Sequence, residues 1–517
     1  MKKILITGGS GQLGYDIYRE LNKRYGDDVK IFMPNHAVLD ITDENSVREL
    51  IDSFKPDVVF HAAAYTKVDD AEDNKEACFK ANSYATQVIA EACESIGAKL
   101  IYVSTDYVFD GKKGSPYSEG DLINPINIYG SSKAAGEKKA MLNPKTFVVR
   151  TSWVFGINGK NFVKTMLDLA EKRDKLTVVS DQIGSPTYTV DLARLLVDMS
   201  ESDKYGIYHA TNEGDTTWYN FAKEIFDVNN KNITVEPVTS EEYSSKAERP
   251  TDSRLSKQKL IDAGFKPLPH YRDALERFSS ELEAYKEYMA TYYANENVEF
   301  ANKTKAISTN LKDCYVINPH VFGDARGSFA PIFMAEYMEQ LGFRKSVQDN
   351  RSISHKGVFR GLHFQKDPYS QAKIVYVDKG AAFVVVVDMR VDSPTYLKGT
   401  SLFLTPFDPS DPKSGLELFV PAGFAHGYLA LKDNTWYMYK IDNDYMPSSE
   451  GGVLWCDPSL DIDWKRLFAE GCIDEDDLDL KDDDKNRPKL DGTEEYFHCK
   501  KLELNNKPTN YNFEVGM

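Results

Sequence analysis

The stretch "ITGGSGQLG", residues 6–14, decides the fold of the first half of the chain. It follows the apolar run "KILIT" (3–7) and opens the helical pattern "QLGYDIYREL" (12–21), so its glycines stand at a strand-to-helix turn. Glycines allow a pyrophosphate to approach the backbone, and the helix N-terminus supplies amide groups for that anion. A tight turn that binds nothing is the alternative. The position of the glycine stretch at the start of a βαβ series favours a nucleotide site over this alternative.

The alternation of strands and helices continues to about residue 290. Apolar runs such as "DVVFHAA" (57–63) and "KLIYVST" (99–105) alternate with helical patterns. Near-continuous apolar strands between helices indicate a parallel sheet covered on both faces. We therefore predict an α/β, Rossmann-like, doubly wound domain with a small substrate-binding lobe over residues 1–297.

The pattern changes at about residue 311. Short β-rich runs such as "AKIVYVDKG" (372–380) and "AAFVVVVDMR" (381–390) are punctuated by Gly, Pro and Asp. This pattern is typical of an antiparallel barrel or jelly roll, which we place over residues 311–517. A polar segment, 298–310, is expected to be the linker. The acidic run 474–486 is interpreted as a solvated loop.

Composition narrows the class of partner and the compartment. The 517 residues carry a net charge of −17, which disfavours nucleic acid or an anionic membrane as the main partner. The six cysteines show no metal-binding spacing and are expected to be reduced thiols in the cytoplasm. We see no signal peptide, and no apolar run approaches the ~20 residues that span a bilayer.

Three further stretches of the first half are expected at the carboxyl ends of strands. "HAAAYTKVD" (61–69) supplies the small residues Ala62, Ala63 and Ala64, and "VSTDYVFDG" (103–111) supplies the hydroxyl of Thr105. "YGSSKAAGE" (129–137) sets Tyr129 four residues before Lys133, on adjacent helical turns. A nearby lysine stabilises a phenolate, so we expect the pKa of Tyr129 to fall. Such a tyrosine can protonate a ketone oxygen as hydride arrives. An exposed Tyr beside a solvated Lys is the alternative.

A second set of polar residues lies in the β-rich half. "RGLHFQ" (360–365) contains His363 but has Gly361 where a metal-binding barrel commonly has a second histidine. His363 is therefore interpreted as an acid/base group, and no metal is predicted. A lone histidine is usually structural. The residues that favour a site here are Arg326, Gln348, Asn350, Arg360, Lys373, His426 and Tyr439.

Residues 1 to about 297 resemble the extended short-chain dehydrogenase/reductases, and more narrowly the dTDP-4-dehydrorhamnose reductase family. The strings that carry the resemblance are "ITGGSGQLG", "STDYVFDG", "YGSSKAAGE", "VVRTSWVFG", "DQIGSPTYTVDLA" and "RPTDSRLS". The resemblance implies Thr105, Tyr129 and Lys133 as the catalytic set, with NADPH or NADH as the coenzyme. It implies coenzyme contacts at Gly8, Gly11, Gln12, Leu13, Gly14, Asp40, Ile41, Ala62, Ala63, Ala64, Tyr129 and Lys133.

The same resemblance places Trp153 in a sugar pocket and Arg249 and Ser253 near a nucleotide diphosphate. Core packing is an equally good interpretation of Trp153. Some members bridge their dimer through a metal bound by a glutamate just after the glycine turn. This chain has Tyr15 there, so that metal is not predicted.

Residues 311 to about 492 resemble the dTDP-4-dehydrorhamnose 3,5-epimerase family, which has a cupin fold. "RGLHFQ", "VVDMRVDSPTY" and "VPAGFAHGY" carry this resemblance. It implies His363 as the base, Tyr439 as the opposing acid and Lys373 at the enolate oxygen. An aspartate orients His363. We align Asp484 to it, although Asp482 and Asp483 are close competitors. The substrate contacts that it implies are Arg326, Phe329, Gln348, Asn350, Arg360, His426 and Tyr445. Pro331 replaces a glutamate often found in that family.

The two resemblances together predict a bifunctional enzyme. Epimerisation at C3 and C5 needs the 4-ketone of a dTDP-4-keto-6-deoxyhexose, and the reductase then consumes it to give dTDP-L-rhamnose. The same chemistry on a UDP-sugar, a non-catalytic cofactor-sensing subunit, and one active domain beside a dimerisation module are the alternatives. A homodimer or larger homo-oligomer is expected, because such cupins usually dimerise through the barrel.

Overall fold

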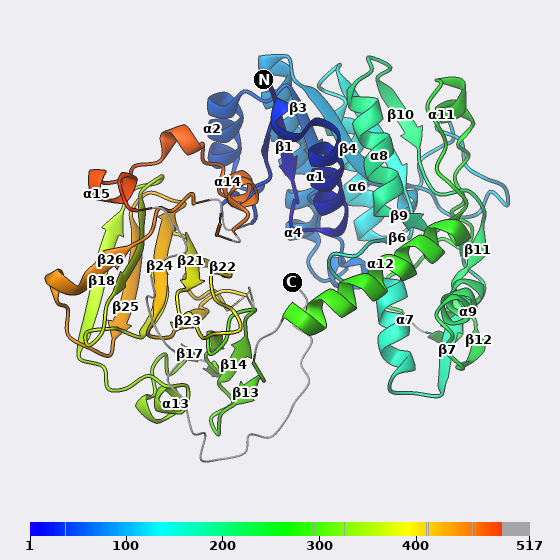
Figure 1. Cartoon of the computed structure of the whole chain (residues 1–517). Coiled ribbons are helices and arrows are strands. Elements are labelled where there is room, and N and C mark those ends of the chain that lie inside the picture. The colour runs from blue at the N-terminus through cyan, green and yellow to red at the C-terminus, as the bar shows by residue number, and fades with distance from the viewer. Residues whose placement is uncertain are drawn as a thin grey trace. The chain divides into compact units, whose positions relative to one another are not determined.

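The computed structural model describes residues 1–488 except 37, 244, 293, 294, 325, 410, 412, 458 and 461. The chain divides into two compact units, Met1–Tyr285 and a second unit that begins at Lys286 (Figure 1). Helix α12 (Tyr271–Tyr292) runs through this division. Each unit has its own sheets and its own core, and each is described by itself below.

A six-stranded parallel sheet forms the centre of the first unit. Its order is β10-β5-β4-β3-β1-β2, so the order reverses between β1 and β3, where ligands of such folds bind at the carboxyl ends of the strands. The doubly wound fold predicted from the sequence is confirmed. The strands are β1 (Lys2–Thr7), β2 (Val29–Phe32), β3 (Val58–His61), β4 (Lys99–Thr105), β5 (Thr146–Thr151) and β10 (Gly206–His209).

Helices cover both faces of this sheet (Figure 1). Helices α1 and α8 pack together, and α5 packs against both α2 and α6. The helices follow from amphipathic patterns; Val47, Ile51 and Phe54, for example, form the buried face of α2. Their bounds are α1 (Gln12–Tyr25), α2 (Glu44–Phe54), α3 (Val68–Ala71), α4 (Lys75–Phe79), α5 (Ala85–Ile96), α6 (Ile128–Ala140) and α8 (Thr189–Ser200).

The first unit also contains the expected small lobe. Its core joins Phe155, Leu167, Phe221 and Phe278 in one apolar cluster. Three short strand pairs, β6–β9, β8–β11 and β7–β12, surround that core. The elements of the lobe are β6 (Val154–Phe155), α7 (Phe162–Ala170), β7 (Lys175–Val179), β8 (Ile183–Gly184), β9 (Thr187–Tyr188), β11 (Thr216–Thr217), α9 (Trp218–Val228), β12 (Thr234–Val238), α10 (Ser240–Tyr243) and α11 (Gln258–Asp262).

Two antiparallel sheets face each other in the second unit. The seven-stranded sheet has the order β13-β14-β15-β23-β20-β25-β18, and the five-stranded sheet has the order β22-β21-β24-β19-β26. Alternating side chains such as Val375, Val384, Leu418 and Tyr437 from both sheets form one buried cluster between them. The β-sandwich expected for a cupin is therefore confirmed.

The strands of the second unit are short and are joined mostly by loops. They are β13 (Val298–Glu299), β14 (Lys305–Ser308), β15 (Tyr315–Asn318), β16 (Phe322–Asp324), β17 (Gly327–Phe329), β18 (Gln348–Ser354), β19 (Phe359–Gln365), β20 (Lys373–Lys379), β21 (Ala382–Asp388), β22 (Gly399–Leu404), β23 (Glu417–Val420), β24 (Phe424–Ala430), β25 (Thr435–Ile441) and β26 (Glu450–Gly452). The helices are α13 (Ala335–Gln340), α14 (Trp464–Gly471) and α15 (Asp482–Lys485).

The segment 298–310, which we expected to be a linker, differs from that expectation. It contains β13 and β14, which pair with each other and continue the seven-stranded sheet through β15. Asn295 already belongs to this unit, because its side chain bonds the carbonyl oxygens of Leu311 and Cys314. The polar composition of the segment reflects an edge of the sheet rather than a free connection.

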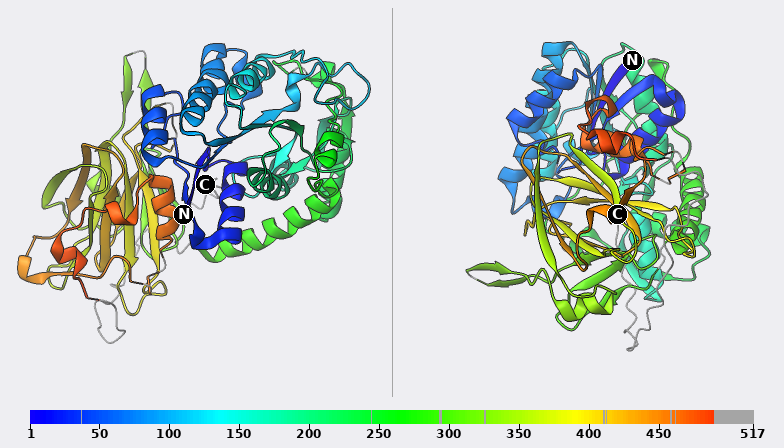
Figure 2. Two further views of the ribbon diagram at one scale, coloured as in Figure 1. Left: turned by 90° about the horizontal axis from the view of Figure 1, so that it is seen from above. Right: turned by 60° about the vertical axis from the view of Figure 1, so that its left-hand side comes forward.

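Strands β16 and β17 form a sheet of their own and project from the sandwich as a two-stranded hairpin (Figure 2). None of the described helices in either unit is long and apolar enough to cross a membrane.

We predict that the two units fold separately when the chain is cut between Tyr292 and Asn295. Each unit has its own buried core, and the strands β13 and β14 stay with their sheet at this cut. Both fragments should be soluble and should unfold cooperatively in calorimetry. Fragments that are insoluble alone but fold when joined would show one interdependent fold.

Candidate active sites

The glycine turn of the first unit has the geometry of an anion cradle. Gly11 caps α1, and the N–H of Gly11 donates to the oxygen of Gly8 at 2.9 Å. A Cβ on Gly14 would lie 2.2 Å from the oxygen of Gly8, so only glycine permits this close turn. The amides of Gln12, Leu13 and Gly14 open the helix, where an anion is favoured by the helix dipole. The residues present therefore fit a coenzyme pyrophosphate.

The alanines expected beside the coenzyme lie next to this turn. Ala62, Ala63 and Ala64 follow β3, and a Cβ on Gly8 would lie 2.7 Å from the nitrogen of Ala63. Asp40 uses its carboxylate to accept from the amide of Thr42 at 2.8 Å, so it shapes the turn that contains Ile41. The side chain of Gln12 donates to the oxygen of Lys160 at 3.1 Å and accepts from Asn161 at 3.0 Å.

Helix α6 brings Tyr129 and Lys133 to the end of β4. Asn127 caps the helix by accepting from the amide of Gly130 at 2.7 Å. A Cβ on Gly130 would lie 2.2 Å from the oxygen of Tyr107, so the missing side chain lets α6 approach the segment after β4. There the hydroxyl of Thr105 lies beside the phenol of Tyr129. The ammonium of Lys133 donates to the oxygen of Val103 at 2.7 Å and lies 4.1 Å from the Tyr102 ring centroid.

The direction of the Tyr129 shift corrects our expectation. Burial raises the pKa of the Tyr129 phenol above its ordinary value, and the bond from Thr105 offsets only part of that effect. Burial also lowers the pKa of Lys133 to about 7, against the opposing charge of Glu137. Tyr129 therefore stays protonated, which is the state that a proton donor needs. The expectation failed because Lys133 faces a carbonyl oxygen and a ring rather than a phenolate.

Asp106 is a site residue that we missed, although it stands inside the quoted string "VSTDYVFDG". It is 2% exposed, and its Oδ1 accepts from the hydroxyl of Thr105 at 3.0 Å. Its pKa is raised to about 6 by burial, which outweighs contacts with Ser253 and Thr105. Asp106 thus orients the same hydroxyl that contacts Tyr129. An acidic residue directly after a candidate hydroxyl was the available signal.

The residues predicted for the sugar pocket and for the nucleotide diphosphate take the following positions. Trp153 has φ of 48° and stacks on Trp218, with ring centroids 3.6 Å apart. Arg249 forms an ion pair with Asp69 at 2.7 Å. Ser253 is buried and contacts Asp106. Trp153 is thus half-buried against another indole, and Arg249 is engaged by a carboxylate.

In the second unit, His363 contacts Asp484 across 121 residues of sequence. The Nε2 of His363 lies 2.5 Å from Oδ1 of Asp484, whose side chain is 3% exposed. Burial alone would raise the pKa of Asp484, but the hydrogen bond and charge of His363 lower it below its ordinary value. Among the three aspartates left open by the sequence, Asp484 is the one with this contact. Short helix α15 directs it inward, whereas Asp482 is highly exposed.

Lys373, His426 and Tyr439 come from three different strands of the sandwich. His426 on β24 contacts the hydroxyl of Tyr437 on β25 at 2.8 Å, which joins the two sheets through the interior. Burial lowers the pKa of Lys373 to about 8, against the opposing charge of Glu450. Burial raises the pKa of the Tyr439 phenol, and Arg360 partly offsets that shift. His363 lies on the five-stranded sheet, and Tyr439 lies on the seven-stranded sheet.

Further residues of the predicted set border this cluster. Asn350 is the cross-strand neighbour of Tyr439 and accepts from Gln348 at 2.7 Å. Arg360 donates to Ser354 at 3.3 Å. Tyr445 donates to Glu450 at 2.8 Å. Glu450 was not predicted. Its charge acts on both His363 and Lys373, so it belongs to the site, and its string "PSSEGG" carried no recognisable signal.

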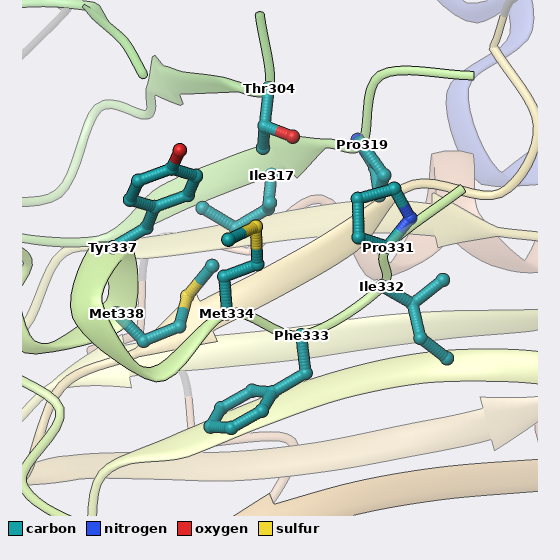
Figure 3. A pocket seen from close by; sticks show the side chains of 9 residues that line it. All are labelled: Thr304, Ile317, Pro319, Pro331, Ile332, Phe333, Met334, Tyr337 and Met338. Carbon is teal, nitrogen blue, oxygen red and sulfur yellow. The ribbon is translucent and has the colours of Figure 1, made fainter. Parts of the chain in front are cut away.

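Two predicted residues lie apart from this cluster. Arg326 and Phe329 stand on the projecting hairpin, where Arg326 pairs with Asp324 at 2.5 Å and Phe329 is 68% exposed. Pro331 lines a small apolar pocket together with Ile317 and Met334 (Figure 3).

Comparison with known proteins identifies the first unit. Residues 1–284 match the family described as RmlD substrate binding domain. The chain belongs to this family. Residues 308–491 match a second family, described as dTDP-4-dehydrorhamnose 3,5-epimerase.

Individual relatives of the RmlD half agree with this assignment. The spore coat polysaccharide biosynthesis protein SpsK of Bacillus subtilis is 42% identical over 282 residues, which are 54% of this chain and 98% of that protein. The dTDP-4-dehydrorhamnose reductase of Aggregatibacter actinomycetemcomitans is 44% identical over 283 residues, 52% of this chain and 95% of that protein. The crystal structure of dTDP-4-dehydrorhamnose reductase from Bacillus anthracis in complex with NADP is 41% identical, with a TM-score of 0.53, and covers 54% of this chain and 100% of that one.

Tyr15, where some RmlD-type proteins carry a metal-binding glutamate, packs against the core of the small lobe. The guanidinium of Arg19 lies 5.5 Å from its ring centroid. Within the described residues, no group of three or more His, Cys, Asp or Glu side chains is arranged to hold a metal ion.

We predict that Asp106→Asn stabilises the RmlD unit more at pH 8 than at pH 5. A folded-state pKa of about 6 against an ordinary 3.8 means that the folded carboxyl binds more protons between these values, so stability falls as pH rises through this window. The ionised Asp106 carboxylate lowers the free energy of unfolding by its full amount only above pH 6. The stabilisation by Asp106→Asn should therefore be about 1 kcal/mol larger at pH 8 than at pH 5. Calorimetry of the whole chain measures this stability change on the unfolding transition of the RmlD unit, which is the one that NADPH shifts to higher temperature.

Asp110→Asn is the matched control. The pKa of Asp110 is lowered by bonds from Asn124 and Tyr117, so its carboxylate is ionised at both pH values. Its substitution should cost stability about equally at pH 5 and pH 8. An Asp106→Asn effect without pH dependence would contradict the assigned cause.

Proposed function

We propose that this chain carries out two consecutive reactions on one dTDP-linked 4-keto-6-deoxyhexose. The second unit inverts C3 and C5, and the first unit reduces the 4-ketone with NADPH to give dTDP-L-rhamnose. The observation that carries this proposal is that each unit holds a complete proton-transfer set, His363 with Asp484 and Tyr129 with Thr105. The two family matches and the NADP complex of a relative support it.

In the epimerase unit, His363 removes the proton beside the ketone. Asp484 holds the imidazole through Nε2 and compensates the charge that forms on the ring. Carbons 3 and 5 both flank C4, so removal of either proton places negative charge on the same oxygen. Lys373, whose ammonium is poorly solvated, stabilises that oxygen in both steps.

Inversion requires a proton from the face opposite His363. Tyr439 stands on the facing sheet and its phenol is kept protonated by burial, so it is the donor in our proposal. Arg360, Gln348, Asn350 and His426 border the same interior and would hold the diphosphate and the sugar.

Arg326 and Phe329 fit this function in an assembly of two copies. Their hairpin projects from its own sandwich (Figure 2). Phe322 and Phe329 on this hairpin expose two aromatic rings, 47% and 68% accessible. We propose a homodimer in which the hairpin of one protomer lies against the partner, with Phe329 and Tyr445 flanking the thymine ring. Exposed aromatic pairs on an isolated hairpin favour a covered state.

In the reductase unit, Tyr129 donates its proton to the C4 oxygen. Thr105 donates its hydroxyl proton to Asp106, which holds this hydroxyl beside the phenol of Tyr129. Lys133 lies one helical turn from Tyr129. Because its pKa is about 7, it is partly an ammonium cation and partly a neutral amine near pH 7. When bound, NADPH supplies the hydride for C4. The residues that would hold it are the turn of Gly8, Gly11 and Gly14 and the strand-end alanines 62–64.

Two observations weigh against the alternatives. A cofactor-sensing subunit would not need the buried Thr105–Tyr129–Lys133 set, and a mere dimerisation module would not need the His363–Asp484 pair. The family name attached to residues 308–491 favours dTDP over UDP. We expect the enzyme to act in the cytoplasm, where its nucleotide-sugar substrate is made.

We predict that Tyr129→Phe abolishes NADPH oxidation, with a loss of about 10²–10⁴-fold, because the ketone oxygen loses its proton donor. Epimerisation should persist, reported by solvent deuterium uptake at C3 and C5 of the dTDP-4-keto sugar. Tyr25→Phe, which removes a hydroxyl that donates to Glu201 near the surface at 3.3 Å, is the matched control. Simultaneous loss of deuterium uptake and reduction would contradict two separate sites.

We predict that His363→Ala reduces deuterium uptake at C3 and C5 by orders of magnitude, because the base is missing. NADPH binding should be unchanged, and a separate active epimerase should restore NADPH oxidation. The control is His355→Ala, which removes an exposed histidine paired with Asp479 at 3.0 Å. A chelator should leave the wild-type epimerase unaffected. Chelator sensitivity that a divalent metal reverses would show that His363 is a ligand.

A further inference from the structure

We propose that Arg487 is a positioning residue of the epimerase site, which holds Asp484 and Glu450 together beside His363 and compensates their charges. This inference rests on the proposed function of the second unit. Arg487 belongs to none of the strings that carry a family resemblance.

The guanidinium of Arg487 reaches both carboxylates. Its Nη2 donates to Oε1 of Glu450 at 2.8 Å, and its Nε lies 3.7 Å from Oδ1 of Asp484. That Nε is buried and has no hydrogen-bond partner among the described residues. The same Oδ1 of Asp484 is 2.5 Å from Nε2 of His363. One cation therefore connects the histidine–aspartate pair to β26.

The backbone around Arg487 is arranged to admit its side chain. A Cβ on Gly452 would lie 2.8 Å from the Nε of Arg487, so the guanidinium occupies the space that a side chain there would fill. Gly452 is also the cross-strand neighbour of His363. The next residue, Pro488, accepts from the amide of Leu454 at 3.0 Å. The segment after α15 is thus held beside β26, next to His363.

The charges of this region need such a cation. Asp484 and Glu450 are two carboxylates that both act on His363. The other titratable groups near them are Lys373 from β20 and Tyr445 from the loop before β26, which both act on Glu450, and His426 from β24, which acts on His363. Burial would raise the pKa of both carboxyls, and hydrogen bonds from His363, Tyr445 and Arg487 hold them below their ordinary values.

The consequence for catalysis concerns the proton that the cluster binds. Proton abstraction requires the pair of His363 and Asp484 without an added proton. Loss of the Arg487 cation makes uptake of a proton by this coupled cluster easier, so the competent form disappears at higher pH. Loss of mere packing would lower the rate without moving its pH dependence.

The test measures solvent deuterium uptake at C3 and C5 of the dTDP-4-keto-6-deoxyhexose between pH 5 and 9, with the whole chain. The acid limb of the profile is the pH range in which deuterium uptake falls as the pH is lowered. In Arg487→Met, which keeps the aliphatic stem and removes the charge, this acid limb should move up by about one pH unit. Arg487→Lys should bring the limb back toward that of the wild type. Lys485→Met is the matched control, because Lys485 is two residues away and, among the described residues, pairs with the exposed Asp482 at 3.8 Å. Its profile should not move.

The calorimetric transition of the second unit, the one that NADPH does not shift, reports on whether the epimerase unit of each variant is folded. A uniform loss at all pH values that Arg487→Lys does not recover would overturn the inference, as would an unmoved limb in Arg487→Met. Absence of deuterium uptake in the wild type would instead overturn the proposed function itself, so the two failures are distinguishable.

Discussion

The close packing of α6 on the end of β4 is the constraint on which the reductase site depends. Beneath it lies a buried ion pair, in which Arg150 donates to both oxygens of Glu137 at 2.8 and 2.7 Å while Ser104 donates to the same carboxylate at 2.6 Å. Glu137 is on α6, and its partners are on β4 and β5. A buried pair satisfied on both sides tolerates no sliding of the helix, because any shift leaves a charge unpaired. Tyr129 and Thr105 therefore meet with little freedom.

The epimerase unit meets the same need for precise proton transfer with a different geometry. In the reductase, helix α6 and the end of strand β4 present one proton donor to one face of the ketone. In our proposal, two facing sheets give the epimerase a base on one side and an acid on the other, and the His426–Tyr437 contact joins the sheets through the interior. The dry interior that shifts the pKa of Lys373 to about 8 also strengthens its attraction for an enolate oxygen. Each fold thus supplies the proton geometry that its reaction requires.

The sequence predicts periodic and local features of this protein better than its long-range contacts. The parallel sheet and the β-sandwich follow from apolar periodicity, and the α6 pair follows from a four-residue spacing. The choice among Asp482, Asp483 and Asp484 was open, because three adjacent aspartates differ only in the direction that α15 gives them. Glu450 and Arg487 meet through folding alone, 37 residues apart. The error about Tyr129 has the same origin, since spacing shows that Lys133 is near but not that it faces Val103.

The separation of the two sites follows from their chemistry. Epimerisation needs a base close to C3 and C5, and it returns the ketone with each turnover. Reduction needs a neutral acid at the C4 oxygen, the role that we propose for the buried Tyr129, and it removes the ketone. A strong base beside the bound coenzyme and sugar would exchange the stereocentres again while hydride transfer was under way. Two pockets avoid this conflict, and a single chain keeps their amounts equal. The reduction then withdraws the epimerised ketone from an equilibrium that proton transfer alone cannot drive.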